Sequence, residues 1–291
     1  MAEHDRTTHA VMVIGAGTMG RGIAQVVADA GYPTLLHDAD GAGQQRGLDA
    51  IRQAWTRLEE KGKRTAEQTA AALSLLRPAS SLSEAAEVKM VIEAVFENLE
   101  VKTGLFRELD RIVPGEGVLA SNTSSISVTK LASATTSPER VVGLHFFNPV
   151  PVLPLVEVVR AVQTSDATTD RAVAFATSLG KTAVVVLDSP GFVANRILLP
   201  MINEAIFTLG EGVASAEAID QVMKLGMAHP MGPLALADLI GLDVCLDILQ
   251  TLHRDFGDDK YRPAPLLTSM VAAGRLGRKS GEGFFVYADG R

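Results

Sequence analysis

Short apolar runs alternate with helical segments along the first part of the chain. Residues 10–14 form an apolar run that ends at Gly15, and the apolar positions after it recur at helical spacing until Gly31 stops them. A second apolar run, residues 34–37, ends at Asp38. This order of strand, glycine turn, helix, strand and acid predicts the start of an α/β sheet.

Residues 41–76 interrupt the alternation with a pattern of two helices. Gly62 separates them, and Thr65 with Gln68 has the spacing of a capping box at the start of the second helix. A crossover between parallel strands needs one helix, so the pair reads as an inserted hairpin. Insertions in open α/β sheets often cover a ligand.

The alternation then resumes and later stops. We expect strands over residues 88–95, 117–120, 140–147, 155–159 and 183–187, with helices over 99–112 and 170–179. Beyond Asp188 the apolar spacing is helical, including one long pattern over 234–256. The sequence therefore predicts an α/β domain, residues 1–188, followed by an all-α domain, residues 189–291.

Composition narrows the class of protein. In 291 residues, 27 Lys and Arg stand against 34 Asp and Glu, a net charge of −7, which disfavours a dedicated nucleic-acid binder. A hydrophobic share of 47% excludes a disordered chain. No run has the length of a membrane helix, the first ten residues are polar, and no Cys/His cluster predicts a metal site. We expect a cytoplasmic protein in which the single cysteine, Cys245, is a buried apolar filler.

One segment of the predicted hairpin carries a local positive charge. Between Arg52 and Arg64 five cations stand against two acids, a surplus of three. This pattern is typical either of a solvated helix end or of a surface that binds an anionic group.

The glycine turn is the first candidate for chemistry. Gly15 permits a tight turn, Gly17 lets backbone approach a pyrophosphate, and Gly20 allows close packing of helix on strand. Asp38, at the end of the second strand, is placed to bind a ribose diol and repel a 2′-phosphate, which favours NAD over NADP. The motif does not separate NAD from FAD, and a purely structural turn is the alternative.

His145 is the most informative titratable residue. It ends an apolar strand, where ligands bind in α/β sheets, and Glu157 follows in the next strand-like run after a proline-rich turn. A hairpin-like return would let the carboxylate fix the tautomer of the imidazole for proton transfer. The spacing alone leaves a buried core histidine and an unrelated carboxylate equally open.

Two further sets of polar side chains are weaker candidates for ligand binding. The hydroxyls of residues 121–125 follow a strand end, where capping of the helix near Ser127 is the favoured interpretation and ligand binding the alternative. No nucleophile-elbow glycines surround them, which argues against a hydrolase. Asn195, near the start of the second domain, has a local hydrogen bond as its ordinary interpretation.

Taken together, several segments resemble 3-hydroxyacyl-CoA dehydrogenases, above all the short, monofunctional 3-hydroxybutyryl-CoA dehydrogenases. They occur in the family's order from the first strand to the C-terminus: GAGTMGRGIA at 15–24, SNTSS at 121–125, HFFNPVP at 145–151, PGFVANR at 190–196, HPMGPL at 229–234 and RKSGEGF at 278–284. The resemblance implies a Rossmann-type, mostly parallel sheet with an inserted helical hairpin, then an all-α domain.

The resemblance also implies a reaction and the residues that perform it. (S)-3-Hydroxyacyl-CoA and NAD would give 3-oxoacyl-CoA and NADH, reversibly. His145 would take the hydroxyl proton and Glu157 would orient it, while Ser124 would bind the reacting oxygen and Asn195 the thioester side. The matching NAD contacts are Gly15, Ala16, Gly17, Thr18, Met19, Gly20, Asp38, Glu97, Lys102, Ser124, Asn148 and Lys279.

For the substrate and the assembly, the resemblance implies that the hairpin, about residues 41–76, covers coenzyme A. Lys61 stands at the family's contact position, whereas Ala54 replaces a serine found in some members, which puts one hydrogen bond to CoA in doubt. The segment Leu153-Pro154 also departs from the family's Met-Lys. The helical domain would form a homodimer.

Two alternatives remain open from the sequence. One is a 3-hydroxyadipyl-CoA dehydrogenase of aromatic-acid breakdown, because the selectivity for the acyl tail depends on the shape of the pocket. The other is a non-catalytic, NAD-binding protein like the lens crystallins related to this family. The presence of His145, Glu157, Ser124 and Asn195 argues against the second.

Overall fold

The computed structural model describes residues 9–287. The chain divides into two compact units, Met1–Ser189 and Pro190–Arg291. The division falls in the Asp-Ser-Pro-Gly segment where the strand pattern of the sequence stops.

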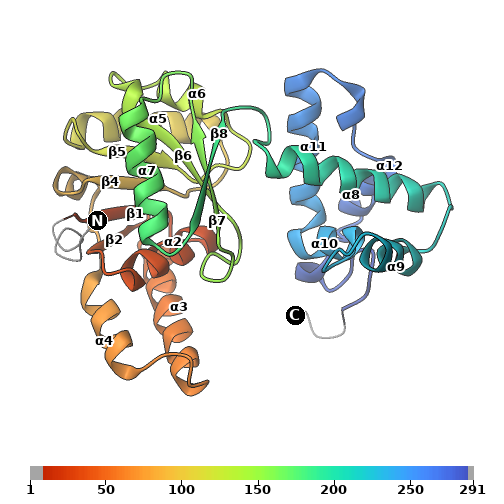
Figure 1. The fold of residues 1–291 in the computed structure, drawn as a ribbon, viewed down its shortest axis with the longest axis horizontal. Helices are drawn as coiled ribbons and strands as arrows, with labels where there is room; N and C mark the ends of the chain where they lie inside the picture. Colours follow the sequence, from red (N-terminus) through yellow and green to blue (C-terminus); the bar gives the residue numbers. More distant parts are fainter. Residues whose placement is uncertain (1–8, 288–291) are drawn as a thin grey trace. The chain divides into compact units, whose positions relative to one another are not determined.

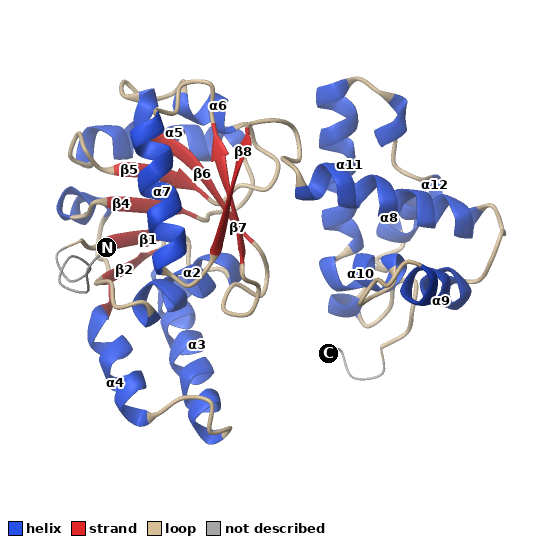
Figure 2. Cartoon of the chain, in the orientation of Figure 1, coloured by secondary structure: helices blue, strands red, loops and turns tan. Residues whose placement is uncertain are grey.

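The first unit contains an eight-stranded sheet of order β3-β2-β1-β4-β5-β6-β7-β8 (Figures 1 and 2). Neighbouring strands are parallel except β6 and β7, which are antiparallel. The mostly parallel sheet followed by a helical unit confirms the predicted fold class. The strands are β1 Val11–Ile14, β2 Thr34–His37, β3 Leu76–Pro78, β4 Met90–Glu93, β5 Val118–Ser121, β6 Val141–Phe146, β7 Leu155–Arg160 and β8 Thr182–Leu187.

Helices cover the sheet, and α7 crosses one face of it in Figure 1. The central strands are covered on both faces and are mostly apolar, and Val13, Ile92 and Leu144 have no exposed surface. The helices of this unit are α2 Thr18–Asp29, α3 Gly41–Glu60, α4 Ala66–Leu75, α5 Leu99–Ile112, α6 Val128–Ala132 and α7 Asp166–Ser178.

The inserted hairpin consists of α3 and α4, and it is fastened to α2. The predicted capping box at the start of α4 is present. Trp55 of α3 is fully buried and donates to Asp29 of α2 at 3.2 Å, while Arg64 pairs with the same carboxylate at 2.7 Å. The short strand β3 directly after α4 was not predicted, because Leu-Arg-Pro has no apolar run to mark it.

The second unit is built from helices around its own core. They are α8 Ala194–Gly210, α9 Ala216–Gly226, α10 Pro233–Ile240, α11 Leu242–Phe256 and α12 Pro265–Ala272. The single long helix expected over 234–256 is wrong: it breaks between α10 and α11 at Gly241, which has φ +106°. The apolar spacing continues across this break, so periodicity could not reveal it.

No helix within residues 9–287 combines the length and the hydropathy that a membrane crossing requires. Within the same residues, no three His, Cys, Asp or Glu side chains come together as a metal site would need.

Candidate active site

The glycine turn between β1 and α2 tolerates no side chain at two of its positions. Gly15 has φ +101°, and a Cβ there would lie 2.5 Å from the carbonyl oxygen of Ala94, the residue after β4. A Cβ at Gly20 would lie 1.7 Å from the carbonyl oxygen of Gly15. At Gly17, by contrast, the space where a side chain would project is open. Backbone is therefore presented to a ligand at the middle of the turn.

The surroundings of this turn fit a dinucleotide. Helix α2 starts without a side-chain cap, so its first N–H groups remain available to a phosphate. Asp38 accepts the amide of Ala16 at 2.7 Å and that of Asp40 at 2.9 Å, which ties the end of β2 to the turn. A cavity of about 380 Å³ lies beside them and is mostly apolar, with walls that include His37, Leu82, Val95, Phe96 and Leu105. An adenosine group would fit these walls, with its ribose near Asp38.

His145 and Glu157 face each other across β6 and β7. They form a register pair of the antiparallel ladder, and Nδ1 of His145 lies 2.7 Å from Oε2 of Glu157. Both residues are buried. A carboxylate can only accept, so the proton of this bond lies on Nδ1. In the neutral ring, Nε2 is then the nitrogen that can accept a proton.

The loop that carries Ser124 lies at the neighbouring strand end. Asn122, directly after β5, accepts the amide of Phe146 at 2.9 Å and so joins this loop to the end of the His145 strand. The expectation that the hydroxyls of residues 121–125 cap the next helix is wrong, because Ser127 itself caps α6. Ser124 is half-buried.

Glu97 is the acceptor that shapes this loop. Its Oε1 accepts the backbone amides of Ser124 at 3.0 Å and Ser125 at 3.1 Å, and the hydroxyl of Thr123 at 2.5 Å. Its Oε2 lies 3.1 Å from Nζ of Lys102. Burial would raise the pKa of Glu97, but the charge of Lys102 and these hydrogen bonds outweigh it and hold the pKa below its ordinary value.

Lys102 connects this carboxylate to a second one that is fully buried. Its Nζ lies 2.6 Å from Glu93 at the end of β4, and Glu93 also accepts the hydroxyl of Ser121 at 2.6 Å. The Lys102 side chain is only 1% exposed. The contacts of Lys102 are with Glu93 and Glu97, and the contact with NAD that the resemblance implied stays a prediction. Glu93 was missed from the sequence, although an acid at the end of an apolar strand was a visible signal.

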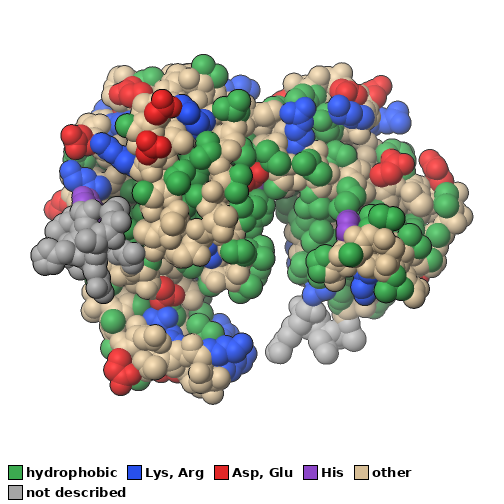
Figure 3. Space-filling view, in the orientation of Figure 1, with side chains coloured by type: hydrophobic (Ala, Val, Ile, Leu, Met, Phe, Trp, Pro, Cys, Tyr) green, Lys and Arg blue, Asp and Glu red, His purple; other side chains and the backbone are tan. Residues whose placement is uncertain are grey.

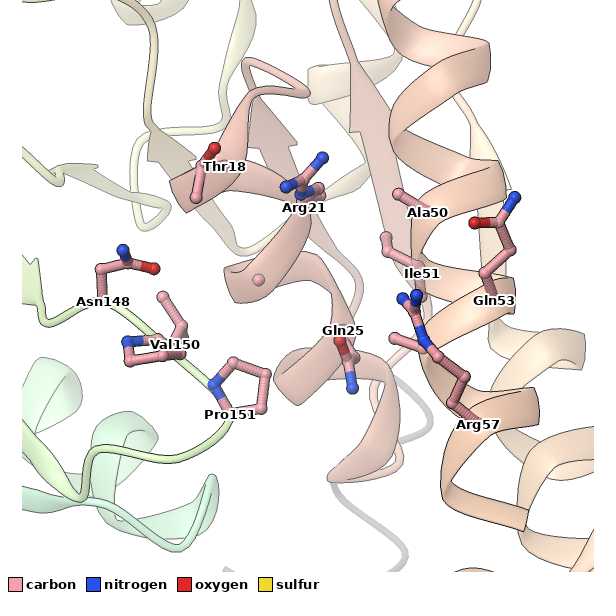
Figure 4. A pocket seen from close by; sticks show the side chains of 13 residues that line it. Thr18, Arg21, Gln25, Ala50, Ile51, Gln53, Arg57, Asn148, Val150 and Pro151 are labelled. Carbon is pink, nitrogen blue, oxygen red and sulfur yellow. The ribbon is translucent and has the colours of Figure 1, made fainter. Parts of the chain in front are cut away.

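A second cavity, of about 390 Å³, lies between α2, α3 and the loop after β6 (Figure 4). Arg21 of α2 and Arg57 of α3 line it, opposite Asn148, Val150 and Pro151 of the loop. Both arginines are exposed, and no acid in the described residues pairs with either. Arg21 was missed in the sequence, where it stands directly after the glycine turn.

The basic surplus predicted for the hairpin divides into paired and unpaired cations. Arg52 pairs with Asp49, and Arg64 pairs with Asp29. In contrast, none of the acids that the structure describes forms an ion pair with Arg57, Lys61 or Lys63. Figure 3 shows Lys and Arg side chains on the surface toward the hairpin's tip.

Two residues of the hairpin that the resemblance singled out differ in their position relative to this cavity. Lys61 ends α3 as its C-cap and is exposed, outside the residues that line the cavity. Ala54 does line the cavity, at the position where the resemblance implied a serine in some members of the family. A methyl group there offers no hydrogen bond to a ligand.

The second unit carries the remaining predicted residues. Asn195 is buried in the first turn of α8. Lys279 lies in a short 3₁₀ helix, Arg278–Ser280, with Nζ 2.5 Å from both carboxylate oxygens of Asp243. Cys245 is fully buried, and burial raises the pKa of its thiol to about 12, which suits a core filler and not a nucleophile.

Comparison with protein families decides the class. The model of the 3-hydroxyacyl-CoA dehydrogenase NAD-binding domain matches residues 10–189, and that of the C-terminal domain matches residues 191–287. The chain belongs to the 3-hydroxyacyl-CoA dehydrogenase family. It is an NAD-dependent oxidoreductase, as the resemblance implied.

Individual relatives of this dehydrogenase agree along nearly the whole chain. It is 53% identical over 279 residues to the probable 3-hydroxybutyryl-CoA dehydrogenase of Bacillus subtilis, covering 96% of this chain and 97% of the relative. It is 40% identical over 286 residues to the mitochondrial hydroxyacyl-coenzyme A dehydrogenase of Sus scrofa, covering 95% and 90%. The crystal structure of (S)-3-hydroxybutyryl-CoA dehydrogenase PaaH1 from Ralstonia eutropha matches with a TM-score of 0.93 at 48% identity, covering 97% of this chain and 100% of that one.

Proposed function

We propose that this dehydrogenase converts (S)-3-hydroxybutyryl-CoA and NAD reversibly to acetoacetyl-CoA and NADH. The observation that carries the mechanism is the 2.7 Å pair of His145 and Glu157 at the carboxyl end of β6. The short acyl chain is supported by relatives that are named 3-hydroxybutyryl-CoA dehydrogenases.

In this mechanism Nε2 of His145 accepts the proton of the 3-hydroxyl group. Bound NAD supplies the acceptor for the hydride that leaves carbon 3. Glu157 keeps the Nδ1 proton in place and stabilises the imidazolium that forms. In the reverse direction the imidazolium returns its proton to the oxygen of the 3-oxo group.

Further roles for individual residues rest on the family resemblance. Ser124 donates a hydrogen bond to the reacting oxygen, and Asn195 steadies the thioester side of the substrate. The glycine turn, Asp38, Asn148 and Lys279 bind NAD. Glu97 and Lys102 support that site by holding the Ser124 loop, an interpretation favoured by the bonds of Glu97 to the loop.

Coenzyme A occupies the cavity beside the hairpin. Its phosphates meet Arg21 and Arg57, which lack acidic partners in the described residues, with Lys61 at the end of α3. The apolar segment Val150-Pro151 faces the pantetheine chain from the opposite wall. Guanidinium groups bind phosphate through paired N–H donors, so these two arginines suit the ligand.

The test is oxidation of NADH by acetoacetyl-CoA, repeated with NADPH and with 3-oxoadipyl-CoA. We expect turnover with NADH and acetoacetyl-CoA, and a much lower kcat/KM with NADPH. A kcat/KM that is higher for 3-oxoadipyl-CoA than for acetoacetyl-CoA would instead support a 3-hydroxyadipyl-CoA dehydrogenase. Absence of turnover with both thioesters, alongside tight NADH binding, would instead indicate a non-catalytic relative.

The proposed assembly is a homodimer formed through the second unit. Large apolar side chains are exposed there, which favours burial against a partner: Ile197, Val213, Val222, Leu225 and Met227. Sedimentation should return a dimer, and a purely monomeric protein would contradict the proposal. A cytoplasmic location remains a prediction of the sequence.

A further inference from the structure

A buried lysine outside the proposed chemistry holds one wall of the cavity. Lys181 lies just before β8 and is 9% exposed. Its Nζ donates to the carbonyl oxygen of Val150 at 2.5 Å and to that of Leu153 at 2.8 Å. No carboxylate in the described part of the chain pairs with it, and burial lowers the pKa of Lys181 below its ordinary value. Backbone oxygens of a single loop are therefore its partners.

That loop connects β6 to β7 and also forms part of the cavity wall. It follows the strand that carries His145, and its residues Asn148, Val150 and Pro151 line the cavity opposite α2 and α3 (Figure 4). Val150 is 2% exposed and packs against α2, where a Cβ on Gly22 would lie 3.0 Å from the Val150 Cβ. The loop is held between a helix on one side and an ammonium group on the other.

We propose that Lys181 is a positioning residue that sets the distance between this loop and the arginine-bearing helices, and thereby the affinity for the acyl-CoA. This rests on the proposed function in so far as the cavity holds coenzyme A. Two carbonyl groups lose their donor when the ammonium is removed, and the loop then moves or admits water. The proton transfer itself does not involve Lys181, so binding should suffer more than the chemical step.

Lys181→Met tests the idea, because methionine is an unbranched side chain only one atom shorter than lysine and has no N–H donor. We expect KM for acetoacetyl-CoA to rise about tenfold, with kcat changed less than threefold. Hydrogen exchange of the amides in residues 147–154 should become faster. Lys181→Arg, which keeps charged donors, should recover part of both effects. Should the methionine variant not fold, Lys181→Gln provides the same comparison with one weaker donor.

Thr164→Val is the matched control. Thr164 is also buried and also bonds backbone, accepting from Ala161 and donating to Val141, but it lies at the other end of β6. The Thr164→Val variant should be less stable than the wild type, with unchanged KM for acetoacetyl-CoA and unchanged hydrogen exchange in residues 147–154. Equal KM effects in Lys181→Met and Thr164→Val, or unchanged exchange in the methionine variant, would overturn the proposal.

The exchange measurement separates this proposal from the proposed function. A wild-type enzyme that does not turn over acetoacetyl-CoA would contradict the function, while the loop's exchange would still report on Lys181. Faster exchange without any rise in KM, in an active enzyme, would show that the loop's position does not govern substrate affinity and would reject the inference.

Discussion

His145 and Glu157 stand directly opposite each other in the antiparallel ladder of β6 and β7, with Nδ1 2.7 Å from Oε2. Two neighbouring strands thus hold the acid–base pair at a set distance. Strands are rigid supports, and a site built on them is positioned more accurately than one built on loops.

Replacing His145 with glutamine should remove the proton acceptor and retain a polar side chain. We expect kcat for acetoacetyl-CoA reduction to fall by about 10²–10⁴, the usual contribution of general acid–base catalysis. NADH binding, followed by fluorescence titration, should stay within about twofold. Turnover equal to that of the wild type would eliminate the mechanism.

Glu157→Gln should have a smaller effect on the same rate. The amide can still accept from Nδ1, but it carries no charge to stabilise the imidazolium. We expect a loss in kcat of about 10- to 100-fold, with KM for both substrates little changed. A loss as large as that of His145→Gln would show that control of the Nδ1 tautomer, and not the charge alone, is the main contribution of the carboxylate.

Asp38→Ala should weaken NADH binding and reduce the discrimination against NADPH. The carboxylate accepts the amide of Ala16 and is placed to bind a ribose diol, so KM for NADH should rise about tenfold and the preference over NADPH should shrink. Steady-state kinetics with both cofactors measures this. Asp49→Ala removes an exposed acid that pairs with Arg52, and it should leave both KM values unchanged.

Glu97→Gln should alter how stability depends on pH. The folded-state pKa of Glu97 lies below its ordinary value of 4.5. Its charge therefore stabilises the fold fully above that ordinary value, and this contribution is lost as the pH falls through the folded-state pKa. In urea unfolding, the wild type should be more stable than the variant at pH 6, and the gap should narrow below about pH 4.5.

Glu100→Gln is the control for that series. Glu100 is exposed in the first turn of α5 and has no hydrogen-bond partner among the described side chains. Its difference from the wild type should stay small across the same pH range. A gap for Glu97→Gln that stays constant from pH 6 to pH 3 would contradict the bonding described for Glu97.

Arg57→Ala should weaken acyl-CoA binding through a loss of charge. We expect KM for acetoacetyl-CoA to rise several-fold at low ionic strength and less at high salt, because exposed charges are screened. KM for NADH should not change. Arg52→Ala removes a nearby cation of the same helix whose charge is already paired with Asp49, and equal effects of the two changes would argue against a specific phosphate contact.

Local patterns predicted those parts of the fold that depend on neighbouring residues. The run into Gly15, the capping box of Thr65 and Gln68, and the helix Leu99–Ile112 all follow from short-range spacing, and the structure confirms them. The break at Gly241 was missed because helical spacing continues across it. A Cβ at Gly241 would lie 3.1 Å from Nζ of Lys279, a residue that is distant in the sequence.

The candidate site shows the same division. Motifs named His145, Ser124 and the glycine turn, since each stands at the end of an apolar run. They could not reveal that Glu97 organises the Ser124 loop or that Lys181 holds the loop after β6, because those bonds join segments about 27 to 31 residues apart.

The sequence alone determined the order of elements and the type of chemistry, because hydrophobic spacing and the conformations open to glycine depend on only a few neighbouring residues. The pairing of His145 with Glu157, the buried Glu93–Lys102 pair and the cavity lined by Arg21 and Arg57 arose only on folding. Strand register and helix packing bring these groups together, and the free energy of burying distant residues against one another determines both.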